Sequence, residues 1–71
     1  MLHFTRYALK KFDILNAHHI FITKEQAEDV VSLPDNVALK GKYHVATKDS
    51  ISVIYRLEGD VKHIITFYPI K

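Results

Sequence analysis

Hydrophobic and polar residues alternate along the last third of the chain. In residues 51–57, and again in residues 61–68, an apolar side chain stands at nearly every second position. A period of two is typical of half-buried β-strands, because successive side chains of a strand point to opposite faces. The pattern predicts two strands here, preceded by a third at residues 42–47. A short strand at residues 37–39 is an optional fourth.

The first half of the chain has the spacing of helices. Between residues 5 and 18, apolar residues recur at intervals of three and four, and Thr5 can cap the N-terminus. Thr23 and Gln26 have the spacing of a capping box for a second helix. This helix is predicted to end before Pro34, because the residue preceding a proline avoids helical geometry.

The order of these elements predicts an α+β fold. Residues 1–71 are expected to form one domain, with two N-terminal helices packed on one face of a three- to four-stranded antiparallel sheet. A chain of this length buries only about 60% of the surface that its unfolded state exposes. Its stability is therefore marginal, and a second copy of the chain or another protein is an expected partner.

The lengths of the predicted turns determine which side chains share a face. Three-residue loops at 48–50 and 58–60 place apolar residues opposite one another, whereas shorter loops would reverse the faces. We therefore predict three-residue loops. The face under the helices is then expected to contain Tyr43, Val45, Val53, Tyr55, Leu57, Val61, Ile65 and Phe67. The opposite face is expected to contain Lys42, His44, Ser52, Arg56, Lys62, Thr66 and Tyr68, around Ile54 and Ile64.

Charge is distributed unevenly in this weakly basic chain. The formal net charge of +2 permits binding to nucleic acid without requiring it. Residues 25–35 contain acidic residues and no basic one. On the predicted open face, Lys42, Arg56 and Lys62 would lie side by side, at a cost of a few tenths to about 1 kcal/mol for each like-charged pair. These residues either hold an anion or simply line a solvated face.

Composition excludes several classes of protein. The chain has no cysteine, so disulfides and thiolate metal sites are excluded. No apolar run approaches the ~20 residues of a membrane span, and the N-terminus lacks the pattern of a signal peptide. Glycine-rich phosphate loops and nucleophile elbows are also missing. We expect a cytoplasmic protein that contacts no membrane and needs no metal or cofactor.

Five histidines in 71 residues is a high number. His18 and His19 would point about 100° apart on a helix, which disfavours a shared metal ion. His63 is predicted to be a hydrogen-bonded histidine of the core, and His3 to be solvated. His44, on the predicted open face, is the better candidate for function.

Tyr7, Lys11 and His18 lie on one stripe of the first predicted helix. They are either boundary residues whose polar ends reach water or a cluster for acid–base catalysis and phosphate binding. Cleavage of RNA without a metal requires a base, an acid for the leaving oxygen and a cation for the phosphate. Histidine, tyrosine, lysine and arginine can fill these roles.

Three motifs resemble those of a small family within the RelE/ParE-like toxin superfamily, which includes BrnT-type toxins. The family's F-T-x-H-A corresponds to residues 4–8, its I-T-x-E-x-x-E-x-V to residues 22–30, and its I-T-x-Y-P to residues 65–69. A Pro-Asp follows the second motif at residues 34–35, and residues 16–19 loosely resemble the N-x-x-K-H of BrnT-type chains. The similarity covers nearly the whole chain.

Members of this kind are regarded as toxin ribonucleases that a partner antitoxin neutralises. The resemblance therefore implies an RNA-directed ribonuclease, and it draws attention to His18 or His19, Arg56, Thr66 and Tyr68. Two positions depart from the family: Tyr7 replaces its early histidine, and His18 stands where an arginine is usual. These departures leave open a relative without activity.

Three hypotheses follow. In the first, the protein is a metal-independent RNA-directed toxin whose candidate catalytic residues are Tyr7, His18, Arg56, Thr66 and Tyr68. Its candidate RNA-binding residues are Lys11, Lys42, His44 and Lys62. In the second, the protein is a non-catalytic module that binds RNA or protein. In the third, it is a homodimer without enzymatic function, formed through the exposed edge of the last strand.

Overall fold

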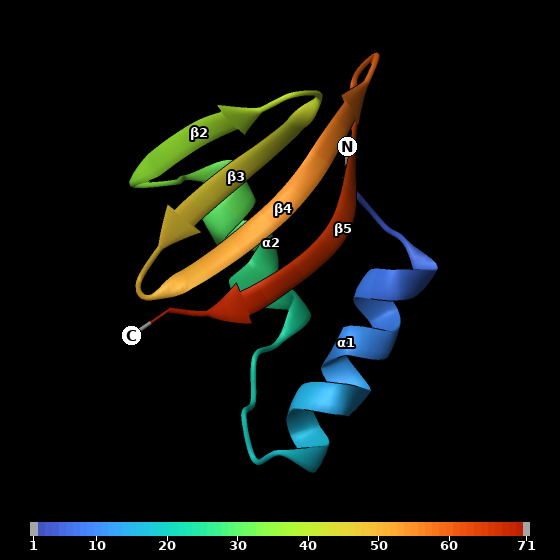
Figure 1. The fold of residues 1–71 in the computed structure, drawn as a ribbon, viewed down its shortest axis with the longest axis vertical. Helices are drawn as coiled ribbons and strands as arrows, with labels where there is room; N and C mark the ends of the chain where they lie inside the picture. The colour runs from blue at the N-terminus through green and yellow to red at the C-terminus, as the bar shows by residue number, and fades with distance from the viewer. Residues whose placement is uncertain (1, 71) are drawn as a thin grey trace.

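A computed structural model describes residues 2–70, so the two end residues of the predicted domain lie outside the description. The elements are β1 (Leu2–Phe4), α1 (Arg6–Ala17), α2 (Lys24–Ser32), β2 (Asn36–Lys40), β3 (Tyr43–Lys48), β4 (Ile51–Glu58) and β5 (Val61–Pro69). Within residues 2–70 the strands form one five-stranded sheet in the order β1-β5-β4-β3-β2 (Figure 1). Neighbouring strands are antiparallel, except that β1 runs parallel to β5. The predicted α+β fold is confirmed.

Both helices begin at their predicted threonine caps. Thr5 Oγ1 accepts a hydrogen bond from the N–H of Ala8 (3.3 Å) and donates one to the carbonyl of Ile64 (2.6 Å), which links the start of α1 to β5. In α2 the N–H of Gln26 donates to Thr23 Oγ1 (3.1 Å), and the N–H of Thr23 donates to Gln26 Oε1 (2.8 Å). A cap of this kind contributes about 1 kcal/mol.

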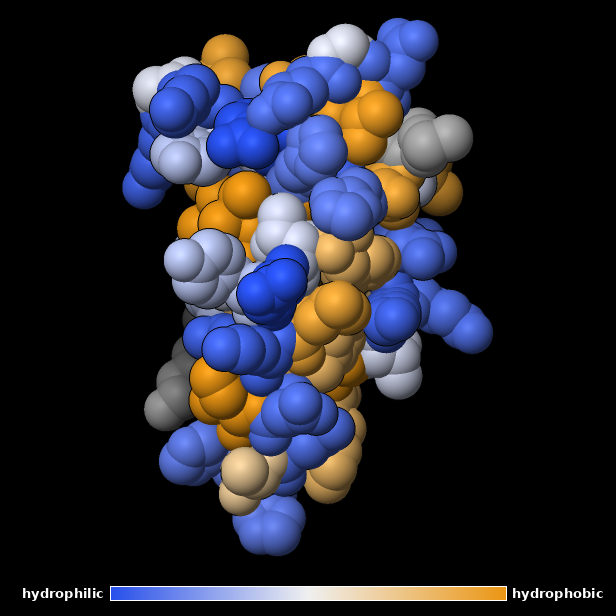
Figure 2. Space-filling view, turned by 90° about the vertical axis from the view of Figure 1, so that its right-hand side faces the viewer, coloured by the Kyte–Doolittle hydropathy of each residue, from blue (hydrophilic) through white to orange (hydrophobic). Residues whose placement is uncertain are grey.

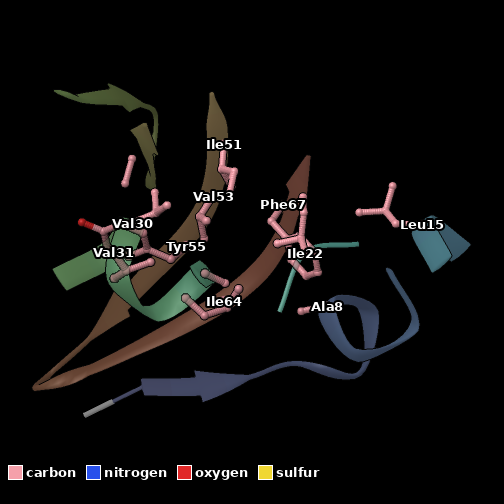
Figure 3. Packing of buried hydrophobic residues seen from close by; sticks show 12 residues of the cluster. Ala8, Leu15, Ile22, Val30, Val31, Ile51, Val53, Tyr55, Ile64 and Phe67 are labelled. Carbon is pink, nitrogen blue, oxygen red and sulfur yellow. The ribbon is translucent and has the colours of Figure 1, made fainter. Parts of the chain in front are cut away.

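The helices cover one face of the sheet and bury a compact apolar core. Figure 3 shows Val30 and Val31 of α2 close to β4, and Ile22 beside Phe67. The ring of Phe12 packs on that of Phe67, with 4.3 Å between the ring centroids. The buried apolar residues are Ala8, Leu15, Ile22, Ala27, Val30, Val31, Ala46, Ile51, Val53, Tyr55, Ile64 and Phe67.

The predicted three-residue loops are wrong, because both hairpins use two-residue turns. Asp49 and Ser50 have φ angles of 51° and 64°, as a type I′ turn requires. The second hairpin turns at Gly59 and Asp60, and Gly59 has a φ of 60°. Turns of the primed types match the right-handed twist of the flanking strands. The three-residue loops were predicted because they place apolar residues opposite one another. In the structure the preference for primed two-residue turns outweighs that pairing.

The shorter turns exchange the faces of β3 and of the first half of β5. Ala46 lies in the core, whereas Tyr43 and Val45 lie on the face turned away from the helices, the reverse of the prediction. On β5, Ile64 is fully buried, and His63 lies on the face turned away from the helices. The prediction of a core position for His63 is therefore wrong.

A β-bulge restores the predicted phase in the second half of β5. Tyr55 pairs with Ile64, but Ile54 pairs with Thr66, so Ile65 is an additional residue in β5. Beyond the bulge, Phe67 is in the core, and Thr66 and Tyr68 share a face with Arg56, as predicted.

The edges of the sheet also differ from the prediction. The last strand, β5, was expected to be an exposed edge, but β1 pairs with it through Leu2, His3 and Phe4. A three-residue strand is too short to show alternation in a sequence, and its parallel partner lies at the other end of the chain. The edge strands of the described sheet are therefore β1 and β2.

One ion pair connects the sheet to α2 and gives a prediction about pH. Lys48 Nζ lies 2.8 Å from Asp29 Oδ2, and the hydrogen bond between them raises the pKa of Lys48. A lysine whose pKa is raised by folding stabilises the fold at pH below its unfolded value, and this contribution disappears as the pH rises through the folded value. We expect Lys48→Met to lower stability by a constant amount up to about pH 9.5, and we expect the difference from wild type to shrink only as the pH rises beyond about 10.5, through the raised pKa of the folded state.

Urea unfolding over a series of pH values measures this effect, with Asp29→Asn as the matched variant. A deficit of Lys48→Met that stays unchanged to high pH would mean that packing of the aliphatic stem, rather than the charge, is responsible.

Candidate nucleic-acid interface

The face of the sheet that is turned away from α1 and α2 is called the open face. In Figure 1 α2 lies behind β3 and β4, so the open face is turned toward the viewer. One row of paired residues crosses the sheet on this face. His3 pairs with His63, and His63 pairs with Arg56. Arg56 pairs with Tyr43, and Tyr43 pairs with Lys40.

Paired residues of adjacent strands point to the same side of a sheet. Lys40, Tyr43, Arg56, His63 and His3 therefore form one line of side chains across the open face, called the cross-strand row below. Strands are about 4.8 Å apart, so the row is about 19 Å long. It contains two cations, a phenol and two imidazoles.

Glu58 lies two residues after Arg56 on the same face of β4, and its carboxylate contacts both Arg56 and His63. Arg56 Nη2 lies 2.6 Å from Glu58 Oε1, and His63 Nε2 lies 3.8 Å from Glu58 Oε2. The rings of His3 and His63 meet edge to face, with 5.2 Å between their centroids. Arg56 Nε is buried and has no hydrogen-bond partner among the described residues. The Arg56 side chain is nevertheless 36% exposed, so part of it is accessible to a ligand.

Apart from Asn36, the rest of the open face is apolar or carries hydroxyl groups. Thr66 and Tyr68 lie beyond the bulge, and Tyr68 is 39% exposed. Tyr68 pairs with Ser52, four residues along β4 from Arg56, which is a distance of about 13 Å. Arg56 and Tyr68 therefore share a face without touching.

The candidate RNA-binding residues do not gather on the open face. Lys42 is exposed in the turn between β2 and β3. His44 and Lys62 lie on the helix side of the sheet, both against Tyr55: the His44 ring stacks on it at 5.0 Å, and Lys62 Nζ lies 5.6 Å from its centroid. The predicted alignment of Lys42, Arg56 and Lys62 is wrong, because the two-residue turns reverse the faces of Lys62 and His44.

The candidate residues of α1 lie in the helix layer, away from the open face. Tyr7 is 77% exposed, Lys11 is half-buried, and His18 is the exposed C-cap of the helix. Figure 2 shows the side of the molecule that carries α1, where hydrophobic side chains reach the surface among hydrophilic ones. The five candidate catalytic residues thus divide into Arg56, Thr66 and Tyr68 on the open face and Tyr7 and His18 in the helix layer.

Four members of the row were missed as candidates: His3, Lys40, Tyr43 and His63. For His3 there was no usable signal, since β1 is so short. For His63 the sequence did contain a signal, because glycine at position 59 suits the first position of a two-residue primed turn. A two-residue turn at residues 59–60 pairs Arg56 with His63, whereas the choice based on apolar pairing does not.

Among residues 2–70, no group of three histidine or acidic residues is arranged to hold a metal ion. No helix in this part of the chain is long and apolar enough to cross a bilayer. Comparison with known proteins finds no matching family model, no matching curated protein and no matching solved structure. The fold and the open face define the class only as a small α+β protein with two helices on a mostly antiparallel sheet.

Proposed function

We propose that the open face binds single-stranded RNA and cleaves it by metal-independent acid–base catalysis. The observation that carries the proposal is the cross-strand row with Glu58 at its centre. Sites for single-stranded nucleic acid combine cations for the phosphates with rings on which bases stack, and each stacked base contributes about 1–3 kcal/mol. Arg56 and Lys40 supply the cations, and Tyr43 supplies a ring between them.

The two imidazoles supply the acid and the base. His63, next to Glu58, accepts the proton of an RNA 2′-hydroxyl, whose oxygen forms a bond to the adjacent phosphorus. The bond from phosphorus to the 5′ oxygen breaks, and protonated His3 donates a proton to that oxygen. The products are a 2′,3′-cyclic phosphate and a 5′-hydroxyl end. Arg56 stabilises the additional negative charge on the phosphoryl oxygens.

The resemblance to RelE/ParE-like toxins also supports RNA cleavage, and it adds a biological role. On that basis the protein is a cytoplasmic toxin with an antitoxin partner. Thr66 and Tyr68 continue the RNA-binding surface along β5, on the face that Arg56 shares. Tyr7, Lys11 and His18 on α1, and Lys42, His44 and Lys62 near the hairpin ends, would then contact other parts of the RNA or a larger assembly.

A second candidate function is binding of RNA without cleavage. It is favoured by the openness of the site, since no pocket is found within residues 2–70. A surface without walls admits water and does not hold the scissile bond as closely as a cleft does.

Cleavage assays in excess EDTA separate these candidates. We expect a labelled RNA to be cut to a 2′,3′-cyclic phosphate, with a maximum in the rate as the pH is varied, because one imidazole must be neutral and the other protonated. His3→Ala and His63→Ala should each lower the rate about 10²- to 10⁴-fold.

An RNA with a 2′-deoxy sugar at the cleavage position should bind and remain intact. Cleavage of this analogue, or a requirement for metal, would contradict the mechanism. Loss of activity in His18→Ala but not in His63→Ala would instead favour the residues implied by the family resemblance. Binding without cleavage of any RNA would support the second candidate.

A further inference from the structure

The outer edge of β2 has no strand beside it within the described residues. All five residues of β2 are exposed, and the apolar side chains of Val37 and Leu39 are 42% and 69% exposed. Natural edge strands are usually protected by proline, by a bulge or by a charge inside the strand. In β2 the charge is confined to Lys40, its last residue, and the Val37–Leu39 stretch contains no proline, bulge or charge.

The turn that follows β2 fixes which backbone groups face outward. A two-residue hairpin turn is closed by a hydrogen-bonded pair, here Lys40 and Tyr43. Bonded and non-bonded pairs alternate along an antiparallel ladder, so Ala38 also directs its N–H and C=O toward β3. Val37 and Leu39 therefore direct two N–H and two C=O groups toward the open edge.

We propose that a second copy of this chain pairs with this edge, antiparallel and centred on Ala38. The strand is complementary to itself in that register. Val37 lies opposite the partner subunit's Leu39, and Leu39 lies opposite the partner subunit's Val37. The outward groups of both strands then form four backbone hydrogen bonds, and the small Ala38 lies at the closely spaced pair on the axis.

Charge supports the same register. Lys40 lies opposite the neutral Asn36 of the partner subunit, so the pairing opposes no like charges. Shifting the register by two residues in either direction loses both bonded pairs between Val37 and Leu39 and leaves one bonded pair, between two copies of Val37 or two copies of Leu39. A larger shift, which centres the axis on Lys40, places two lysines opposite each other.

The two-fold axis of such a pair is perpendicular to the sheet, so both helix layers lie on one side and both open faces on the other. The pairing places the two cross-strand rows on one common face, offset along the strands by about 13 Å because Lys40 lies opposite Asn36 of the partner subunit. The dimer does not depend on the proposed ribonuclease activity, since it rests on β2 alone.

Sedimentation equilibrium of the full chain over a range of concentrations tests the proposal. We expect a monomer–dimer equilibrium that Val37→Lys weakens at least about tenfold, and Leu39→Glu likewise, because each removes two cross-strand apolar pairs. Lys10→Glu, a charge change on the exposed side of α1, is the control and should leave the equilibrium unchanged. Circular dichroism verifies that each variant is folded.

A mixture of the two β2 variants gives the sharper test. In the proposed register the ammonium introduced at position 37 of one chain faces the carboxylate introduced at position 39 of the other, so native mass spectrometry should detect the mixed dimer preferentially. A wild-type chain that stays monomeric at all concentrations would overturn the proposal. A dimer that neither variant weakens, or folded variants that form no mixed dimer, would overturn it as well.

Discussion

Replacing Arg56 with methionine should weaken the binding of a single-stranded RNA oligonucleotide about 10- to 100-fold. A hydrogen bond to a charged group contributes about 1.5–3 kcal/mol, and each 1.4 kcal/mol is a factor of ten. Arg56 stands in the middle of the cross-strand row, and its side chain is 36% exposed. Methionine keeps most of the aliphatic stem, so the change removes the charge and the donors rather than the packing.

Fluorescence anisotropy at several salt concentrations measures this effect. Loss of one phosphate contact should reduce the slope of log K against log salt by about 0.7, the value for a single strand. Lys10→Met removes one positive charge from the exposed side of α1 and is the matched control. Equal losses in the two variants would show that RNA responds to net charge alone, and the open face would then have no special role.

Glu58→Gln should act in the opposite direction on binding. In the free protein the Glu58 carboxylate forms an ion pair with the Arg56 guanidinium at 2.6 Å, and its negative charge also repels a phosphate. Its removal should therefore raise RNA affinity. If His63 is the base and Glu58 orients it, the same variant should lower the cleavage rate. Opposite changes in affinity and rate would separate the orienting role of Glu58 from a contact with RNA.

The parts of the fold that could be predicted from the sequence are those with local causes. Thr5 and Thr23 cap helices because their own hydroxyl groups bond to N–H groups three residues away. The alternation of residues 51–57 assigned β4 correctly, since a central strand is packed on both sides by neighbours. Val53 and Tyr55 are accordingly buried, and Arg56 lies on the opposite face.

The errors arose where an apolar pattern fits two registers. Residues 61–67 contain Val61, Ile64, Ile65 and Phe67, so both phases of β5 bury apolar side chains. The turn decides the phase near the hairpin, and the bulge at Ile65 reverses it further along. A bulge leaves no periodic signal, because it consists of a single additional residue. As a result the sequence predicted Arg56, Thr66 and Tyr68 on one face but missed His63.

The neighbour of His63 could not be found from local sequence at all. His3 reaches it through a parallel pairing between residues at opposite ends of the chain. That pairing is held by Thr5, whose N–H donates to the carbonyl of Ile64 at 3.0 Å, directly beside the bulge. The cap of α1, the bulge and the histidine pair are therefore parts of one local arrangement, and the candidate site depends on the packing of the core beneath it.

Replacing Phe67 with alanine should destabilise the fold by about 3–5 kcal/mol, the cost typical for a buried phenylalanine. Phe67 is fully buried, and its ring lies 4.3 Å from that of Phe12, so the change leaves a cavity between α1 and β5. At about 0.05–0.15 kcal/mol per residue, a chain of 71 residues has roughly 4–11 kcal/mol of stability in total. We therefore expect the variant to be partly unfolded at 37 °C and to melt roughly 12–40 °C lower.

Tyr68→Ala is the control that makes this a test of the bulge. Tyr68 is the next residue along β5 and lies on the open face, 39% exposed, so its truncation should cost less than about 1 kcal/mol. Without the bulge, two-residue turns would place Tyr68 in the core and Phe67 in solvent, and the order of the two effects would reverse. Urea unfolding followed by circular dichroism decides between these orders. The same result bears on the candidate site, because only a bulged β5 keeps Thr66 and Tyr68 on the face of Arg56 while His63 stays beside it.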